Sequence, residues 1–216
     1  NVTHIFNRRS GKDVVIGTSG YGLMLMPNDH SYKAREWEEV NEVVPCRYIT
    51  HIMEDSRGRL WVASGDNSCY IYDPATNNAW RALPEDATSE VNYICEEHSG
   101  RILVVTHSAV FACSRTDSVC HSECFAGEGR DIVSASHDAA GQLLLVMRHE
   151  GMMRYDRTTH TLVPYKPLGS SADRLMRTLS RTSTDSDGNL WMTSATMGVA
   201  MATTSGQTFA HWRRED

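Results

Sequence analysis

A short motif that recurs five times constrains the fold of this chain more than any other feature. Its clearest copy is residues 58–64 (Gly-Arg-Leu-Trp-Val-Ala-Ser), which returns at 188–194 as Gly-Asn-Leu-Trp-Met-Thr-Ser. Weaker copies begin at Gly11, Gly100 and Gly141. The first glycines are 41 to 47 residues apart, so five such units fill the 216 residues. A fixed period of roughly 20–50 residues indicates a repeat architecture.

Within each unit the apolar residues alternate with a period of two, which is typical of β-strands. In the second unit this pattern predicts strands at 48–53, 60–64, 69–72 and 79–83, with a turn at 55–58. In that turn, aspartate at the first position accepts a backbone hydrogen bond and glycine adopts the left-handed conformation. Each unit is therefore expected to contain four strands.

Two further markers fix the later strands of the units. The dipeptide Tyr72-Asp73 returns as Tyr155-Asp156 and predicts the hairpin between third and fourth strands. In four units an aromatic residue marks the fourth strand: Trp37, Trp80, Tyr165 and Trp212. In the first unit this strand is placed at 32–37, because no segment has a convincing helical stripe of apolar residues.

Four-stranded antiparallel units without helices are typical of β-propeller blades. The chain is therefore predicted to be all-β, with five four-stranded antiparallel blades. Their approximate bounds are 1–45, 46–88, 89–129, 130–172 and 173–216.

Composition and charge exclude several classes of partner. The chain has 27 acidic and 21 basic residues, a net charge of −6, and no block of Lys and Arg. Nucleic acids and anionic membrane surfaces require a basic stripe, so neither is an expected partner. The longest apolar run, residues 143–147, is far shorter than the ~20 residues that cross a bilayer. No membrane contact by this segment is expected.

The second unit resembles a known repeat. Residues 49–64 follow the pattern Ile-x-x-Ile-x-x-Asp-x-x-Gly-x-Leu-Trp, and residues 15–18 and 22–23 supply the Val-Ile-Gly-Thr and Gly-Leu segments of it. The chain resembles the two-component regulator propeller repeat family. Units two and five match this pattern well, whereas units three and four lack its tryptophan.

This resemblance implies a role in signalling. Such repeats form the periplasmic sensor region of hybrid two-component systems in gut bacteria, which detect glycan breakdown products and regulate the genes that use them. The resemblance implies a ligand-sensing, non-enzymatic segment of a histidine kinase anchored in the inner membrane. The resemblance implies a sensor region of two seven-bladed propellers and an immunoglobulin-like domain, which is followed by a membrane helix, a histidine kinase and a response regulator.

The five units are accordingly expected to be a fragment of a seven-bladed propeller, with the remaining blades and downstream domains as partners. Because the first and last blades would each leave one face uncovered, either an open arc or a homodimer is expected. A closed five-bladed ring is the alternative, since natural rings contain roughly four to eight blades.

Catalytic and metal-binding motifs are absent from the sequence. It contains no Gly-x-Ser-x-Gly, His-Glu-x-x-His or phosphate-binding Gly-Lys-Ser/Thr motif. Residues 183–188 resemble half of a calcium loop, but Ser183 and Ser194 occupy the positions of essential acidic ligands. No catalytic residue, metal or cofactor is therefore predicted. The ten histidines have no ligand spacing, although a spatial cluster around the propeller axis remains open.

The tryptophans and cysteines leave further alternatives. Trp61 and Trp191 are expected to pack between blades rather than to serve as sugar platforms, because they lie in alternating apolar strands. No two of the six cysteines form a Cys-x-x-Cys pair, which excludes a zinc knuckle. Cys113 and Cys120 flank a tight turn, and either a cross-strand disulfide or two thiols fits this position.

The loops that join second to third strands, and fourth strands to the next blade, should open on one face of the propeller. They carry a mixed polar, aromatic and cationic set of candidate ligand-binding residues: Tyr21, Arg47, Asp66, Asn67, His107, Arg130, Arg148, His149 and Arg174. Such a set suits an acidic or hydroxyl-rich sugar, so the expected ligand is an oligosaccharide or another small molecule.

Two other classes of function remain open: a propeller enzyme of the streptogramin-lyase kind and a protein-interaction scaffold. An enzyme should gather a histidine, a carboxylate and a metal at the axis.

Overall fold

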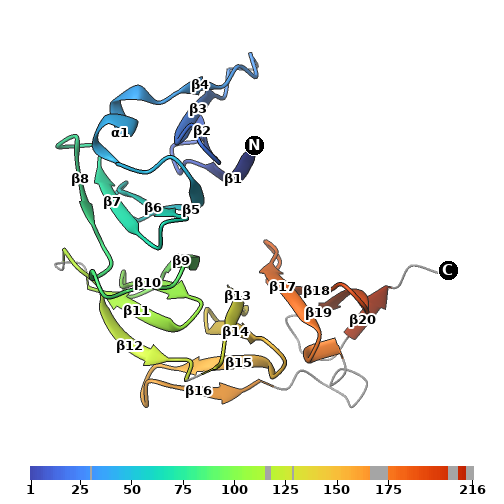
Figure 1. The fold of residues 1–216 in the computed structure, drawn as a ribbon. Coiled ribbons are helices and arrows are strands. Elements are labelled where there is room, and N and C mark those ends of the chain that lie inside the picture. Colours follow the sequence, from blue (N-terminus) through green and yellow to red (C-terminus); the bar gives the residue numbers. More distant parts are fainter. Residues whose placement is uncertain (30, 115–117, 128, 166–174, 204–208, 213–216) are drawn as a thin grey trace. The chain divides into compact units, whose positions relative to one another are not determined.

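The computed structural model describes residues 1–29, 31–114, 118–127, 129–165, 175–203 and 209–212. In these residues it contains five four-stranded antiparallel sheets, which confirms the predicted fold (Figure 1). We number them blades 1 to 5 in chain order. Each blade runs from a first strand to a fourth without changing the order of its neighbours.

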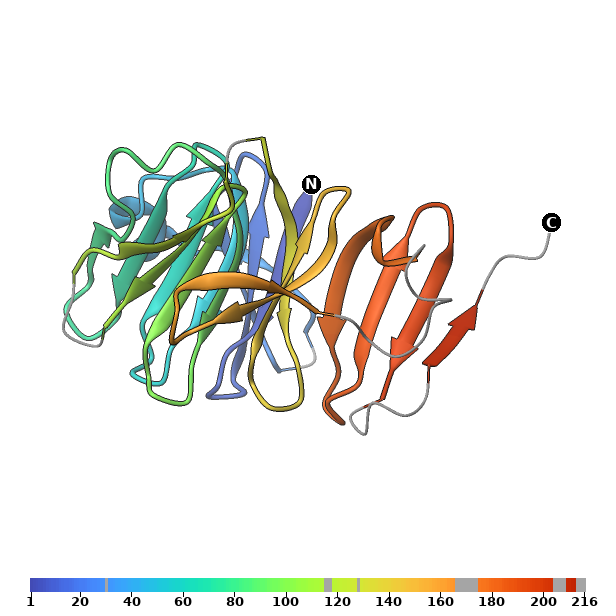
Figure 2. The ribbon, with the colours of Figure 1, turned by 90° about the horizontal axis from the view of Figure 1, so that it is seen from below.

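The strands have the following bounds. In blade 1 they are β1 (Val2–Asn7), β2 (Asp13–Thr18), β3 (Leu23–Pro27) and β4 (Arg35–Glu36). In blade 2 they are β5 (Ile49–Glu54), β6 (Leu60–Ser64), β7 (Cys69–Asp73) and β8 (Asn78–Arg81). In blade 3 they are β9 (Val91–Glu96), β10 (Ile102–Thr106), β11 (Ala109–Cys113) and β12 (His121–Phe125). In blade 4 they are β13 (Ile132–His137), β14 (Leu143–Met147), β15 (Gly151–Asp156) and β16 (Thr161–Pro164). In blade 5 they are β17 (Leu179–Thr184), β18 (Leu190–Ser194), β19 (Gly198–Ala202) and β20 (Phe209–Trp212), which lie side by side in Figure 2.

The chain divides into two compact units. Unit 1 comprises Asn1–Thr106 and Phe111–Ser122, and unit 2 comprises His107–Val110 and Glu123–Asp216. The strands of blade 3 are thus divided between the units. Unit 1 contains blades 1 and 2, and unit 2 contains blades 4 and 5.

One prediction about blade 1 was confirmed only in part. The expected fourth strand at 32–37 is reduced to β4, and the chain continues into the one-and-a-half-turn helix α1 (Glu38–Val43). The side chain of Asn41 takes the place of a strand neighbour, because its Oδ1 accepts a bond from the Leu23 N–H (2.9 Å) and its Nδ2 donates to the Leu23 carbonyl (3.0 Å). The helix also buries Val40 completely.

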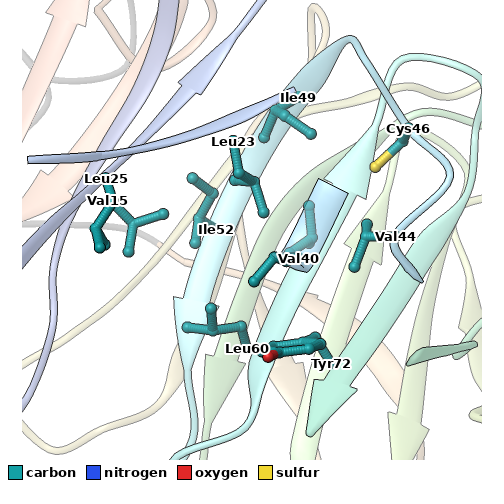
Figure 3. Packing of buried hydrophobic residues seen from close by; sticks show 11 residues of the cluster. Val15, Leu23, Leu25, Val40, Val44, Cys46, Ile49, Ile52, Leu60 and Tyr72 are labelled. Atoms are coloured by element: carbon teal, nitrogen blue, oxygen red, sulfur yellow. The ribbon is translucent and has the colours of Figure 1, made fainter. Parts of the chain in front are cut away.

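Blades 1 and 2 share a continuous apolar core (Figure 3). Ile49 and Ile52 of β5 pack against the backbone of Gly17 in β2, where a Cβ would lie 2.7 Å from Ile49 Cγ2. A larger residue at position 17 would therefore push the first strand of blade 2 away from blade 1. Val40 and Val44 pack in the same cluster.

The recurring turn motif is explained by one aspartate. Asp55 accepts bonds from the Arg57 and Arg59 N–H groups (both 3.0 Å), from Arg59 Nε (2.7 Å) and from the Trp61 indole N–H (3.1 Å). Asp185 repeats this arrangement in blade 5, where Trp191 Nε1 donates to it at 2.8 Å. In blades 2 and 5 the spacing of six residues between Asp and Trp thus ties the first turn to the second strand.

The two tryptophans differ in burial. Trp61 is 0% exposed, as predicted for an inter-blade core residue. Trp191 is only partly buried, and its ring is stacked on Trp212 with centroids 5.8 Å apart.

The turn at the Tyr-Asp marker is also formed by hydrogen bonds between residues close in sequence. The Asp73 carboxylate accepts a bond from the Ala75 N–H (2.9 Å), while the Tyr72 hydroxyl bonds Asn77 (3.0 Å) across the hairpin. Asn77 has a φ of +52°, and His160, the equivalent residue bonded by Tyr155 (2.9 Å), has a φ of +54°. The marker therefore closes the turn between third and fourth strands.

Carboxylates at the ends of first strands hold the blades of unit 1 together. Glu54 is buried and accepts bonds from the Arg9 N–H (2.7 Å) and from Arg8 Nη2 (3.0 Å). Glu96 has the same role in the next blade, accepting from Arg9 Nη2 (3.0 Å) and the Ser56 N–H (2.8 Å). The first turn of blade 1 is thereby bonded to both β5 and β9.

Equivalent positions in first strands allow a matched stability test. Ile52 is 1% exposed, whereas Ile5, at the same register position of β1, is 63% exposed. We expect Ile52→Val to lower the free energy of unfolding by about 1 kcal/mol, because it removes a buried methylene. Ile5→Val should change it by less than about 0.5 kcal/mol, as at other exposed sites. Urea unfolding monitored by circular dichroism measures the free energies of both variants. Equal losses of stability would show that Ile5 is covered as well as Ile52.

The proposed disulfide stays a prediction. Cys113 ends β11 and Cys120 lies just before β12, and both are buried. If the protein matures in an oxidising compartment and the bond forms, their Cβ atoms should lie about 3.5–4.5 Å apart. Thiol titration of the denatured, unreduced protein should then find four reactive cysteines. Six reactive cysteines in such a preparation would contradict the bond.

Candidate functional site

The predicted loop face is built in unit 1 by hydrogen bonds between neighbouring loops. The loop that follows β2 donates two backbone bonds, from Gly20 (2.7 Å) and Gly22 (3.0 Å), to the carbonyl of Arg47. The loop that follows β6 is joined to the same segment, because the Gly65 N–H donates to the Tyr48 carbonyl (2.9 Å). The segment entering β5 is therefore fixed between two loops from adjacent blades.

Two tyrosines are exposed at this junction. Tyr21 is 69% exposed and Tyr48 is 51% exposed. The Tyr48 ring lies directly over Gly65, where a Cβ would come within 2.2 Å of Tyr48 Cδ1. Tyr48 was not among the predicted site residues, because it was assigned to an alternating strand. Its neighbour Ile49 is completely buried, and adjacent residues of a strand face opposite sides. The alternation of Tyr48 and Ile49 was therefore the sequence signal that Tyr48 is exposed.

The other predicted residues of unit 1 have identifiable partners. Arg47 Nη1 forms an exposed ion pair with Glu36 (3.1 Å). Asn67 has a φ of +66° and donates from Nδ2 to the Thr88 carbonyl (2.9 Å). Asp66 accepts hydrogen bonds from Ser68. Burial would raise the pKa of Asp66, but these bonds and one with Ser64 outweigh burial and lower it, so Asp66 is ionised at neutral pH.

In unit 2 the predicted cations are paired with loop carboxylates. Arg130 forms a two-pronged ion pair with Glu150, in which both N···O distances are 2.6 Å. This bond raises the pKa of Arg130 and lowers that of Glu150. Arg148 Nε lies 3.0 Å from Asp131 Oδ2. An anionic ligand would have to compete with these carboxylates for the two guanidinium groups.

The predicted site residues include two histidines, His107 and His149. His149 adopts a φ of +68° in the loop after β14. The His107 carbonyl accepts a bond from the Ile132 N–H (2.8 Å). Arg174 lies outside the described residues.

A second feature of unit 1 lies on the first strands of the blades. In every blade the pairing of first and second strands has a bulge at the same place, just before His4 in β1, His51 in β5 and Tyr93 in β9. A bulge bends its strand and redirects the following side chain. The ring centroids of His4 and His51 are 4.4 Å apart, and those of His51 and Tyr93 are 5.6 Å apart. These strands are neighbours within unit 1 (Figure 1). We call His4, His51 and Tyr93 the ring ladder.

The surroundings of the ring ladder favour the uncharged forms of its three side chains. Burial, aided by the proximity of His4, lowers the pKa of His51 to about 3. Burial also lowers the pKa of His4, partly opposed by a hydrogen bond to the backbone of Ile52. Burial raises the pKa of Tyr93. Both imidazoles and the phenol are therefore neutral at pH 7.

The ring ladder brings together two of the ten histidines, for which the sequence left a spatial cluster open. Within the residues that the structure describes, no carboxylate contributes to the pKa shift of either histidine. The same described ranges contain no group of three or more His, Cys, Asp or Glu residues that could hold a metal ion.

Residues 44–66 match the two-component regulator propeller family. The matched segment spans β5, the Asp55 turn and β6, and it carries Arg47, Tyr48 and Asp66 of the loop face. No curated protein matches the chain in sequence.

Solved structures resemble the chain in fold. The extracellular domain of one hybrid two-component system of B. thetaiotaomicron aligns with 99% of this chain at 15% identity and a TM-score of 0.73. A second such domain from B. thetaiotaomicron aligns with 100% of it at 18% identity and a TM-score of 0.73. Virginiamycin B lyase from Staphylococcus aureus aligns with 99% at 13% identity and a TM-score of 0.74.

The chain covers 28% and 31% of the two extracellular domains and 71% of the lyase. Because sensors and lyase match equally well at such low identity, these alignments establish the propeller fold and not the activity. Among the described residues, no helix is long and apolar enough to cross a membrane.

Proposed function

We propose that this chain is the ligand-sensing propeller portion of a periplasmic hybrid two-component sensor and has no catalytic activity of its own. The observation that supports this most is the match of residues 44–66 to the two-component regulator propeller family, because the same segment supplies Arg47, Tyr48 and Asp66 to the loop face. The parent protein would be a histidine kinase anchored in the inner membrane. Its remaining blades, its downstream domains and a second copy of the chain are the proposed protein partners.

The proposed ligand is an oligosaccharide released by glycan breakdown. Tyr21 and Tyr48 present exposed rings, which combine an apolar face with a polar hydroxyl. The ionised Asp66 follows Gly65, which contacts Tyr48, and provides acceptor oxygens for sugar hydroxyls. Because the loops are already bonded to one another, little ordering is needed when a ligand binds.

Calorimetric titration with a panel of neutral and acidic oligosaccharides tests this proposal. We expect at least one sugar to bind, and Tyr48→Ala to weaken its binding by tenfold or more. Tyr32→Ala is the matched control, because Tyr32 is 75% exposed but lies in the connection between β3 and β4. Equal effects of the two substitutions, or binding to a protein chain instead of any sugar, would contradict the proposal and favour the scaffold alternative.

The lyase alternative has less support. It rests on the fold match to virginiamycin B lyase, whereas the ring ladder offers a tyrosine where an enzyme would need a carboxylate. Turnover of a streptogramin by the purified chain, abolished by His51→Asn, would restore it.

A further inference from the structure

We propose that His4 and His51 together bind one divalent transition-metal ion of the zinc, nickel or copper class, which links the first strands of blades 1 and 2. The two residues come from β1 and β5, at the same register position of their blades. No local spacing in the sequence indicates the pair, because 46 residues separate the histidines.

The distance between the rings fits two ligands of one ion. Two imidazoles that each place a nitrogen about 2.0–2.1 Å from an ion have ring centres roughly 4.5–5 Å apart when the ligands subtend an angle between a right angle and the tetrahedral angle. The centroids of His4 and His51 are 4.4 Å apart, which is just below this range and nearest to the value for a right angle between the two ligands. Their planes are tilted by 54°, so the rings are not stacked face to face.

The hydrogen bonding of the pair also suits coordination. One ring of the pair is held by the backbone of Ile52, which bonds His4. Metal-binding histidines usually have such a partner on the nitrogen that does not bind the ion, since it fixes the tautomer and the ring orientation. Among the described residues the imidazole of His51 has no hydrogen-bond partner. Burial favours the neutral form of both imidazoles, which is the form that binds metal.

The surroundings of the pair determine which ion would bind. Imidazole suits zinc, copper and nickel, whereas calcium and magnesium require several oxygen ligands. Both histidines are only partly buried, so water reaches them and would complete the coordination sphere. Tyr93, with its ring 5.6 Å from that of His51, borders the site on the side of blade 3.

Calorimetry with metal-stripped chain and ZnCl2 or NiCl2 tests the proposal. We expect one equivalent of either ion to bind, with affinity reduced at least tenfold in His4→Asn and in His51→Asn. His98→Asn is the matched control, because His98 is an exposed histidine of the same unit and should leave binding unchanged. CaCl2 and MgCl2 should not bind. No binding of zinc or nickel by the wild-type chain, or an equal loss in His98→Asn, would overturn the proposal.

A second measurement does not depend on the variants being folded. Addition of Zn²⁺ to the ¹⁵N-labelled wild-type chain should shift the ring nitrogen resonances of two histidines together, at one equivalent. A shift of one histidine alone, or of several in proportion to the excess of metal, would show adventitious binding and overturn the two-ligand site. Because these experiments contain no sugar, their outcome is independent of the proposed sensing function.

Discussion

Replacement of Trp61 by alanine should lower the free energy of unfolding by about 3–5 kcal/mol, the range for emptying a buried aromatic site. The indole is completely buried in β6, and its N–H bonds Asp55 at 3.1 Å. Its loss would leave a cavity beside a buried carboxylate that has lost one of its donors. Urea unfolding followed by circular dichroism measures the change.

Two further variants separate the stability lost through the cavity from the stability lost through the hydrogen bond. Trp61→Phe keeps much of the ring volume and should cost about 1–3 kcal/mol, mainly through the loss of the hydrogen bond to the Asp55 carboxylate. Trp191→Ala, at the equivalent but only partly buried position of β18, should cost less than Trp61→Ala. If Trp191→Ala proved the more destabilising, burial would not be the property that makes the motif tryptophan important.

Acidification should destabilise the metal-free chain through the histidine pair. In the unfolded chain His51 should titrate near its ordinary pKa of 6.5, whereas in the folded protein its pKa is about 3. Since the unfolded state binds the proton first, this contribution is fully present above pH 6.5 and is lost as the pH falls towards 3. At pH 4.5 the loss amounts to about 3 kcal/mol, at 1.36 kcal/mol per pKa unit.

A comparison of variants isolates this effect from the titration of carboxylates. Unfolding free energies measured from pH 7.5 to 4.5 in EDTA should fall less steeply in His51→Asn than in the wild type, by about 3 kcal/mol over the range. His4 lies against His51 and its pKa is lowered in the same direction, so His4→Asn should also flatten the curve. Tyr93, the remaining ring in contact with His51, stays neutral throughout this range. Parallel curves for the wild type and His51→Asn would contradict the shifted pKa.

Strand positions were predictable because their causes are local. The strand at 60–64 was predicted with the bounds that β6 has, since alternation and the Asp55 turn both lie within a few residues of it. Helix α1 was missed because its apolar stripe, Trp37, Val40 and Val44, is short and is interrupted by acidic residues. Its helical form depends on Asn41 bonding Leu23, a contact between residues 18 positions apart.

The candidate site was predictable only in outline. Loop positions follow from the order of strands, so Tyr21, Arg47 and Asp66 could be placed on loops from the sequence. Their partners could not, because Arg130 meets Glu150 and Arg148 meets Asp131 only after neighbouring loops have come together. The contact of the Tyr48 ring with Gly65 was hidden in the same way, because it joins the segment entering β5 to the loop after β6.

The sequence by itself determined the repeat, the four strands of each unit and the turns that connect them, because alternation, Asp-Gly turns and the Tyr-Asp hairpin act over fewer than about ten residues. Only the tertiary structure decided which side chains meet across blades. His4 and His51 become neighbours because β1 and β5 pack side by side with bulges at the same register position. Contacts of this kind arise from the packing of whole sheets, which brings together residues that no local pattern relates.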